Sequence, residues 1–510
     1  MQAWLRWPAL GLALIAAGKL ALHLYAGRRY GYFVDELYYL ACARHLAWGY
    51  VDQPPLIAAI ARITQAALGD SITALRFPAA LAGAGTAVMT GMIARELGGR
   101  RFAQSLAALC FVLAPGLLAL DHFLSMNAFE PLFWMGCAYL VMRIIQTGNA
   151  KLWLGFGLLA GLGLENKYSM LIFSFGMVAG LALTRERKWL RSPWFWAGGA
   201  IAFLIFLPNL LWNIQNHFPF LELQANIRRS GRDVALSPIT FLGQETLAML
   251  PLSLPIWLAG LWYLFIDKKE ERFRVLGWAW LVTAAVIMAL SPRIYYLFPA
   301  YPVLFAAGSV AWERWLSGVR GHWIKPVYVT LMVAMSALIA PTVIPLLPPE
   351  TYVRYAAATH LQQPRIENHQ LGPLPQLFAD QFGWEEMAAA VAGAYNSLAP
   401  DVRAKTAIFG QNYGQAGAID LFGPKYGIPQ GTAISGHQSY YLWGPHGYTG
   451  ESMLVMDDRP ERLAEIFIAF RKIAQVSHPY SMPYQHFDVY YCEGMKQPLS
   501  KLWPQVKNWD

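Results

Sequence analysis

The chain has 510 residues, of which 56% are hydrophobic and only 14% are charged. Soluble domains carry roughly 25% charged residues, so this composition excludes an ordinary water-soluble protein and favours one that crosses a membrane several times. The formal net charge of +9 does not indicate a nucleic-acid-binding protein, because the basic residues form short clusters between apolar stretches and no nucleic-acid-binding motif accompanies them.

Apolar stretches predict about eleven transmembrane helices of roughly 17 to 25 residues each. They cover approximately residues 7–27, 74–96, 102–120, 127–146, 151–166, 168–184, 194–212, 239–265, 275–291, 295–312 and 324–346. The stretch 151–166 is short and rich in glycine, so a break or a partial re-entry is most expected there. The first stretch is longer than the core of a signal peptide and lacks a convincing cleavage site, which favours a retained helix.

The distribution of Lys and Arg predicts the orientation of these helices. With the N-terminus in the cytoplasm, the short inner loops hold most of the basic residues, and the longer outer loops hold fewer. This is the asymmetry of the positive-inside rule, although Arg28 and Arg29 run against it. An odd number of helices then places the C-terminal segment of this multi-pass protein outside the cytoplasm.

The C-terminal segment predicts a separate small domain. We expect a transmembrane domain over residues 1–346 and an extracytoplasmic α/β domain over 347–510, because the second range is markedly more polar and opens with proline-rich sequence. The segments TAIFG, ESMLVMD and FDVYYCEG have the pattern of strands. The segments WEEMAAAVAGAYNSL, YGQAGAIDLFG and PERLAEIFIAFRKI have helical spacing.

The long first outer loop, residues 28–73, holds the most informative acidic residues. Asp35 and Glu36 follow the first helix, and Asp52 precedes a Pro-Pro turn. The stretches 36–48 and 56–68 are amphipathic, as in helices that lie at the membrane interface. A carboxylate that is partly desolvated there becomes a stronger base toward a hydroxyl. The alternative is that Asp35 and Glu36 only cap the following helix.

A second acidic group lies in the short outer loop ALDHFLSMNAFEPLFW. It offers Asp121, His122, Asn127 and Glu130 at the mouth of the bundle, where an ionisable residue is a functional candidate. We consider these residues, with Asp52, as acceptor-binding residues. The alternative is a solvated loop with a capping Asn.

Five further residues are candidates for binding a lipid phosphate at the outer interface. Arginine can grip a phosphate with two hydrogen bonds, and lysine supplies a compact charge. Lys167 could instead pair with Glu165 or extend to the interface without a function. The candidates are Lys167, Arg228, Arg229, Arg293 and Tyr295.

A divalent cation is left open as a cofactor. Asp35, Asp52, His122 and Glu130 could supply ligands, but their spacing is not diagnostic. The sequence has no phosphate-binding Walker loop, no HExxH motif and no GxSxG motif, so an ATP-driven pump is not indicated.

Several stretches resemble the GT-C glycosyltransferases, and most of all the branch of the dolichyl-phosphate-mannose protein mannosyltransferases and the bacterial aminoarabinose transferase of lipid A. The first outer loop, YFVDELYYLACARHLAWGYVDQPPLIAAI, carries the resemblance first. LSMNAFEPLFW, GLGLENKY and RIYYLFPAYP follow in the family's order, and IFGQNYGQAGAIDLFGPKYG with SGHQSYYLWGP is similar to the C-terminal part of bacterial members.

The resemblance implies a bundle of GT-C type and an inverting transfer of a sugar from a polyprenyl-phosphate-linked donor to a hydroxyl. Asp35 would be the general base, with Glu36 as its partner in the acidic pair. Asp52 occupies a family acidic position before the Pro-Pro turn, where a relative has a metal-ligating glutamate, and Gln53 stands where that relative has a phosphate-binding lysine. Lys167 matches the family's lysine. The position that matches the family's second acidic loop is either Asn127 or Glu130, depending on the alignment. Arg293 lies near the family's basic position before the tyrosine-rich helix.

The sequence leaves the acceptor open among a glycolipid such as lipid A, another glycan and a protein. Besides the donor and the acceptor, the lipid bilayer is the expected partner. The alternative function is a transporter or flippase of a lipid-linked sugar. A transporter would show repeated halves and ionisable residues near the middle of the membrane, whereas the candidates here gather in outer loops.

Overall fold

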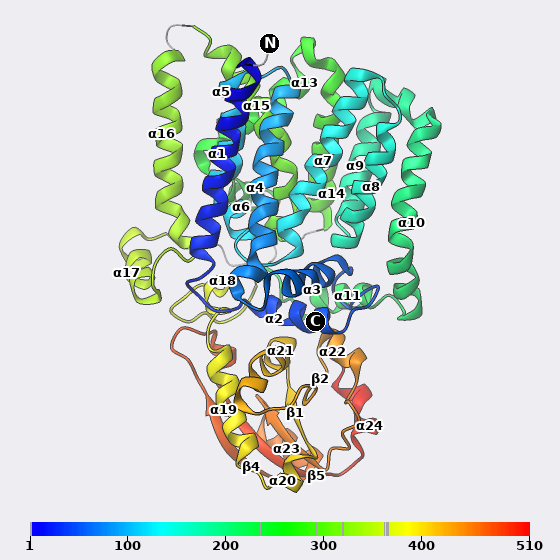
Figure 1. Cartoon of the computed structure of the whole chain (residues 1–510), viewed down its shortest axis with the longest axis vertical. Helices are drawn as coiled ribbons and strands as arrows, with labels where there is room; N and C mark the ends of the chain where they lie inside the picture. Colours follow the sequence, from blue (N-terminus) through cyan, green and yellow to red (C-terminus); the bar gives the residue numbers. More distant parts are fainter. Residues whose placement is uncertain (1–2, 235, 291–292, 319–320, 362, 364–366) are drawn as a thin grey trace.

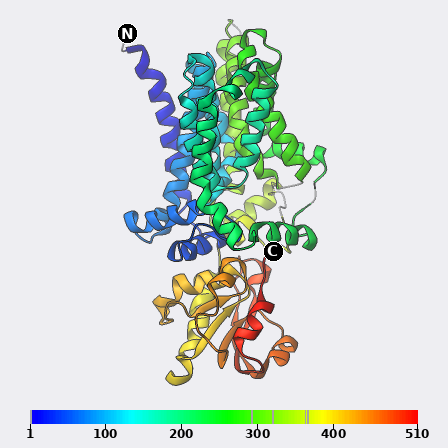
Figure 2. The same cartoon turned by 90° about the vertical axis from the view of Figure 1, so that its right-hand side faces the viewer.

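The structure is a computed structural model that describes residues 3–234, 236–290, 293–318, 321–361, 363 and 367–510. A bundle of long helices forms one end of the molecule, a smaller domain with a sheet forms the other, and short helices lie between them (Figure 1). The N-terminal helix starts at the end of the bundle far from the sheet domain, and the C-terminal residues lie at the junction, as the turned view also shows (Figure 2).

The bundle contains the apolar helices that the sequence predicts. Their bounds are α1 (Ala3–Ala26), α4 (Ile72–Glu96), α5 (Arg101–Leu113), α6 (Pro115–Leu120), α7 (Met126–Thr147), α8 (Leu152–Asn166), α9 (Met170–Ala182), α10 (Pro193–Gln215), α12 (Pro238–Ala248), α13 (Leu254–Phe265), α14 (Arg274–Leu290), α15 (Tyr301–Trp315) and α16 (Gly321–Ile339). Within the described residues, six helices are long and apolar enough to cross a membrane, or up to seven with one bent pair. The other predicted spans fall on shorter helices, so the multi-pass membrane bundle is confirmed.

One predicted span is broken. The stretch 239–265 forms α12 and α13, which meet at an angle of 97°. Leu250 adopts a left-handed backbone with φ of 70°, and Pro251 follows with no N–H to continue the helix. The break that the glycine content suggested at 151–166 is absent, because α8 runs through that stretch.

Glycines set the close approach of neighbouring bundle helices. A Cβ on Gly308 of α15 would lie 1.8 Å from the Ile256 carbonyl oxygen of α13, and one on Gly260 would lie 2.3 Å from the Leu304 carbonyl oxygen. Small residues at such contacts let two backbones pack closely in a membrane, where burial of apolar surface does not drive helix association.

Short helices lie across the end of the bundle that faces the sheet domain. The predicted interfacial stretches are α2 (Val34–Arg44) and α3 (Leu56–Leu68), and α11 (Pro219–Ser230) lies at the same end of the bundle (Figure 1). Beyond the last bundle helix follow α17 (Pro349–Thr359) and α18 (Gln376–Ala379).

The sheet domain has five strands in the order β2-β1-β3-β5-β4. The strands β1, β2 and β3 are parallel, whereas β5 runs antiparallel to both β3 and β4. The strands are β1 (Thr406–Gly410), β2 (Ala433–Ser435), β3 (Ser452–Met456), β4 (Phe467–Val476) and β5 (Phe487–Met495), and the helices are α19 (Trp384–Asn396), α20 (Pro400–Arg403), α21 (Tyr413–Phe422), α22 (Gln438–Trp443), α23 (Pro460–Ile466) and α24 (Leu499–Leu502).

The predicted small α/β domain is confirmed, with one wrong element. The segment 460–473 was expected to be one helix, but α23 ends at Ile466 and β4 begins at Phe467. The sequence Phe-Ile-Ala-Phe can serve either element, and pairing with β5 decides for the strand. The short strand β2 was not predicted.

A hydrophobic core joins the two parts of the molecule. It contains Leu37 of α2, Ala58 of α3 and Ala128 of α7 together with Val391 of α19 and Leu454 of β3. The sheet domain therefore packs on the short helices through buried apolar side chains and is not tethered only by a linker.

We expect Gly308→Ala to lower the free energy of unfolding by about 1–3 kcal/mol, because the added methyl group must push the backbones of α13 and α15 apart. Thermal unfolding of the purified protein in detergent measures this loss. Gly199→Ala on α10 is the matched control, since no atom lies within 4 Å of its added Cβ. A Gly308→Ala protein as stable as the wild type would contradict the packing described here.

Candidate active site

The helix α2 gives two adjacent carboxylates different environments. It begins at Val34, so Asp35 and Glu36 lie in its first turn. The Glu36 carboxylate accepts a hydrogen bond of 2.9 Å from the Phe33 N–H and so caps the helix, as the alternative interpretation of the sequence expected. Asp35 lies on a partly exposed position and takes no part in this cap.

Glu36 is fully buried and held by a charge partner. Arg76 of α4 donates two hydrogen bonds to it, of 2.9 Å from Nε and 2.7 Å from Nη2, and the Leu124 N–H donates a third of 2.9 Å. These donors occupy both oxygens of the Glu36 carboxylate. The geometry therefore describes an anchoring role for Glu36, in contrast to its expected share in catalysis.

Asp35 accepts one hydrogen bond, from a residue of the sheet domain. The Tyr413 hydroxyl of α21 donates to Asp35 Oδ1 at 2.7 Å. Within the described residues, no hydrogen bond reaches Oδ2. Burial raises the pKa of Asp35, and the Tyr413 hydrogen bond opposes that rise. A carboxylate with one oxygen fixed and the other open can accept a proton from a hydroxyl.

Asp52 lies near Asp35 and is held in a similar way. The Tyr38 hydroxyl of α2 donates to Asp52 Oδ1 at 2.9 Å, and a hydrogen bond of 2.6 Å joins the Tyr38 and Ser439 hydroxyls. Burial raises the pKa of Asp52 to about 7, and the charge of Asp35 adds to the rise. We call Asp35 and Asp52 the carboxylate pair.

Lys167 joins the two acidic candidates of the second loop. Its Nζ donates to Asn127 Oδ1 at 2.7 Å and to Glu130 Oε2 at 3.0 Å, both on α7, and lies 4.1 Å from the ring centre of Tyr296. Glu130 also accepts a hydrogen bond from Ser169. These residues form the lysine cluster. Lys167 is 8% exposed, so Glu130 supplies the charge that its burial requires.

Arg293 lies in a group of two arginines and two carboxylates that we call the arginine cluster. Its guanidinium contacts Asp233 Oδ1 at 2.7 Å and also Glu367. Arg232 lies 3.6 Å from Glu367 and 3.8 Å from Asp233. Arg293 also donates to the Tyr295 hydroxyl at 3.4 Å. Two arginines thus face two carboxylates, and a phosphate would have to compete with both acids for Arg293.

The carboxylate pair and the arginine cluster act on each other electrostatically. The charges of Glu367, Arg293 and Arg232 all alter the pKa of Asp35. The buried side chain of Tyr39 lies within electrostatic range of the carboxylate pair and of Tyr295, which lies beside Lys167. Burial raises the pKa of Tyr39, and the charges of Asp35, Asp52 and Tyr295 raise it further. The predicted residues Asp35, Asp52, Lys167, Arg293 and Tyr295 therefore gather in one region.

The other predicted phosphate-binding residues take no part in the contacts that define these three groups. Arg228 and Arg229 are exposed in the last turn of α11, where Arg229 contacts Asn226 at 3.4 Å. Neither forms an ion pair within the described residues, so both are free to meet an anion at the interface.

Asp121 and His122 lie inside the protein and not at an open mouth. Asp121 forms an ion pair of 2.8 Å with Lys19 of α1, and both side chains are 1% exposed or less. Gly83 of α4 makes room for the pair, because a Cβ there would lie 2.2 Å from Asp121 Oδ2. His122 is equally buried. This burial argues against the expected role of either residue in binding an acceptor.

The residues considered as metal ligands do not come together. Across the described part of the chain, no group of three or more His, Cys, Asp and Glu side chains could hold a metal ion. Asp52 is engaged by Tyr38, and Glu130 by Lys167 and Ser169. The described residues therefore offer no divalent cation site.

The sequence did not assign roles to Tyr38, Tyr413 or Arg76. Tyr413 lies in a stretch that carries the family resemblance, so the sequence marked the region but did not indicate what the Tyr413 hydroxyl does. Arg76 stands alone near the start of a predicted apolar span, and a lone charge in such a place signals a buried partner.

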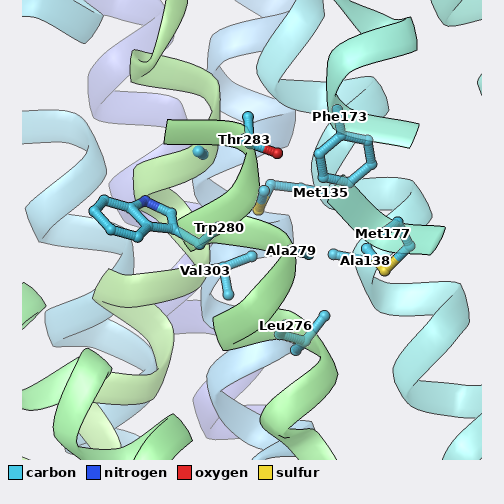
Figure 3. A pocket seen from close by; sticks show the side chains of 10 residues that line it. Met135, Ala138, Phe173, Met177, Leu276, Ala279, Trp280, Thr283 and Val303 are labelled. Carbon is cyan, nitrogen blue, oxygen red and sulfur yellow. The ribbon is translucent and has the colours of Figure 1, made fainter. Parts of the chain in front are cut away.

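The small cavity inside the bundle is separate from these residues. It has a volume of about 10 Å³ and lies among Met135, Phe173, Trp280 and Thr283 (Figure 3). Almost all of its lining is apolar, and none of the predicted site residues contributes to it.

Comparison with known proteins supports the family resemblance. Residues 52–212 match the family of dolichyl-phosphate-mannose-protein mannosyltransferases. This range contains Asp52, Asn127, Glu130 and Lys167 but begins after Asp35. No protein of curated function matches the chain.

The fold is that of a solved bacterial protein. The crystal structure of ArnT from Cupriavidus metallidurans bound to undecaprenyl phosphate superposes with a TM-score of 0.58 at 14% sequence identity, covering 95% of this chain and 98% of that chain. The same protein in the apo state gives a TM-score of 0.59 at 15% identity, covering 94% and 97%. The resemblance to GT-C glycosyltransferases is thus confirmed: part of the sequence matches the dolichyl-phosphate-mannose-protein mannosyltransferases, and the fold is similar to that of ArnT.

We expect Asp121→Leu to lower the free energy of unfolding by about 3–5 kcal/mol, because it leaves the Lys19 ammonium buried without a counter-charge. The double variant Lys19→Met with Asp121→Leu removes both charges and should recover most of the loss. Thermal unfolding in detergent compares the two proteins. Equal losses in the single and double variants would refute the importance of the ion pair.

Proposed function

We propose that the chain is a membrane glycosyltransferase that moves a sugar from a polyprenyl-phosphate-linked donor to an acceptor hydroxyl, with inversion at the sugar carbon. The observation that carries the proposal is the carboxylate pair beside α2. Asp35 is partly exposed, desolvated enough to raise its pKa, fixed at one oxygen and open at the other. These are the properties that a general base for a hydroxyl requires.

The proposed step is a single displacement. An open oxygen of Asp35 accepts the proton of the acceptor hydroxyl while the acceptor oxygen bonds to the anomeric carbon of the sugar. The bond between that carbon and the phosphate oxygen breaks on the opposite face, and its electrons leave with the polyprenyl phosphate. Asp52, whose pKa lies at about 7, is positioned to orient the acceptor or the sugar by hydrogen bonds.

The departing phosphate gains negative charge and needs a cation. Lys167 is the best candidate, because its counter-ion Glu130 also accepts a hydrogen bond from Ser169, and because Asn127 is a neutral partner that a phosphate can replace. Arg228 and Arg229 can meet the phosphate at the interface. Arg293 and Tyr295 support the site from the balanced arginine cluster.

We place the reaction on the extracytoplasmic face of a bacterial inner membrane, where the sheet domain, from about residue 347, covers the site. Nucleotide sugars are unavailable there, so a lipid phosphate ester is the fitting donor. ArnT from Cupriavidus metallidurans was solved with undecaprenyl phosphate, which suggests the same carrier here. The acceptor is a hydroxyl of a glycolipid, a glycan or a protein.

We expect Asp35→Asn to reduce sugar transfer by at least about 100-fold, because an amide cannot take up the acceptor's proton. The measurement is mass spectrometry of envelope glycolipids, glycans and glycoproteins from cells that lack the protein and carry either the wild type or the variant. The wild type should add one sugar mass to an acceptor, and the variant should not.

Asp70→Asn is the matched control for this experiment, since Asp70 is an exposed carboxylate of the same outer loop. Full transfer by Asp35→Asn would remove Asp35 from the mechanism. A wild type that changes only the distribution of a lipid-linked sugar between the two leaflets would instead favour the transporter.

We expect Lys167→Gln to weaken the binding of undecaprenyl phosphate to the purified protein by about tenfold, the effect of losing one charged hydrogen bond. The double variant Lys167→Gln with Glu130→Gln keeps the site neutral and separates phosphate binding from the cost of an unpaired Glu130. Lys188→Gln, an exposed lysine of the loop after α9, is the control. Unchanged affinity in the double variant would exclude Lys167 as a phosphate ligand.

A further inference from the structure

The sheet domain lies directly on the helix that carries Asp35. In α21, a Cβ on Gly414 would lie 2.6 Å from the Val34 side chain, and a Cβ on Gly417 would lie 3.0 Å from the Leu37 backbone. Glycine at these two positions lets α21 approach α2 this closely without displacing Val34 or Leu37. The stretch Tyr-Gly-Gln-Ala-Gly-Ala that begins at Tyr413 is therefore a contact surface for the first turn of α2.

Tyr413 reaches Asp35 from this surface. Its hydroxyl donates to Asp35 Oδ1 at 2.7 Å, and its ring centre lies 4.8 Å from that of Tyr38, the residue that holds Asp52. One aromatic pair, with one ring from each part of the molecule, thus carries the hydroxyls that fix both members of the carboxylate pair.

A second residue of the sheet domain fixes Tyr413. The His437 ring stacks on the Tyr413 ring with centres 4.8 Å apart and planes 7° from parallel. The Tyr413 N–H donates to His437 Nδ1 at 3.1 Å, so Nδ1 carries no proton. Burial lowers the pKa of His437 to about 4, which keeps the ring neutral at physiological pH.

We infer that Tyr413 is a positioning residue supplied by the sheet domain, which orients the Asp35 carboxylate so that Oδ2 remains open to the acceptor hydroxyl, and that His437 holds Tyr413 in place. The sheet domain is then part of the catalytic site and not an accessory. The inference rests on the proposed role of Asp35 as the base.

The charged and titratable groups around Asp35 come from several elements, and Tyr413→Phe alters none of these side chains. They are Tyr39 and Asp52 of the first outer loop, Arg232 and Arg293, Glu367, and Asp380 after α18. A change in the titration of Asp35 on this substitution alone therefore reports the loss of one hydrogen bond.

The test is an infrared titration of the purified full chain in detergent. The absorption of the protonated Asp35 carboxyl is isolated by subtracting the spectra of Asp35→Asn. In Tyr413→Phe we expect the midpoint to move to higher pH by about 1 to 2 units, because the lost hydrogen bond had stabilised the ionised form. A midpoint equal to that of the wild type would overturn the inference.

Two further variants sharpen this test. His437→Phe keeps an aromatic ring against Tyr413 but removes the acceptor of its N–H, so its midpoint should move in the same direction by a smaller amount. It also serves if Tyr413→Phe does not fold, and an unchanged midpoint there would count against the inference. Tyr491→Phe removes a hydroxyl that donates to Glu493 elsewhere in the sheet domain, and its midpoint should equal that of the wild type.

An assay of sugar transfer from an undecaprenyl-phosphate-linked donor to acceptors in an envelope extract separates this inference from the proposed function. Tyr413→Phe should lower kcat and move the acid limb of its pH profile upward, with the KM for the donor unchanged. A raised donor KM with an unchanged acid limb would assign Tyr413 to donor binding and overturn the positioning role. Full transfer by Asp35→Asn would overturn the proposed role of Asp35 as the base, while the infrared midpoint would still decide how Asp35 is held.

Discussion

The buried ion pair between Glu36 and Arg76 is the interaction on which the rest of the site depends. It fixes the first turn of α2 against α4, and the Leu124 N–H ties the same carboxylate to the loop before α7. Burying an isolated carboxylate as a charged group is costly, and the Arg76 guanidinium offsets that cost. Because these hydrogen bonds hold Glu36, the neighbouring Asp35 is held at a defined position in the same helical turn, where it is partly exposed to solvent.

The other buried charges around the site are also matched by charges of opposite sign. Lys167 is matched by Glu130, and the two arginines of the arginine cluster by Asp233 and Glu367. Burial alone would raise the pKa of Glu367, but His369, Arg293 and Arg232 hold it well below its usual value, so this acid stays ionised. Asp35 and Asp52 differ, since neutral hydroxyls are their direct partners, and their pKa values rise. In the proposed mechanism, the acids with ionic partners hold the scaffold, and Asp35 and Asp52 are the acids left for chemistry.

The sequence was sufficient for the bundle, the interfacial helices and most of the sheet domain, because each depends on local hydrophobic pattern. It could not separate the roles of Asp35 and Glu36, since the difference arises from Arg76, which lies 40 residues away. Apolar character continues through residues 239–265, so the pattern hides the bend at Leu250. For residues 467–473, the strand is chosen by a partner and not by local spacing. Tyr413 stood in a recognisable motif, but its partner lies 378 positions earlier.

The hydrophobic core that spans both parts also has a consequence for biosynthesis. The apolar faces of α2 and α3 emerge early from the ribosome, whereas the residues that cover them, from Trp384 to Tyr491, are translated last. Domains made during translation usually fold from the N-terminus onward, but here the first extramembrane segment must wait for the end of the chain. Until the sheet domain is made, the apolar face of α2 and α3 can be covered only by the bilayer surface. A chain that ends before the sheet domain would leave that face without its protein partner.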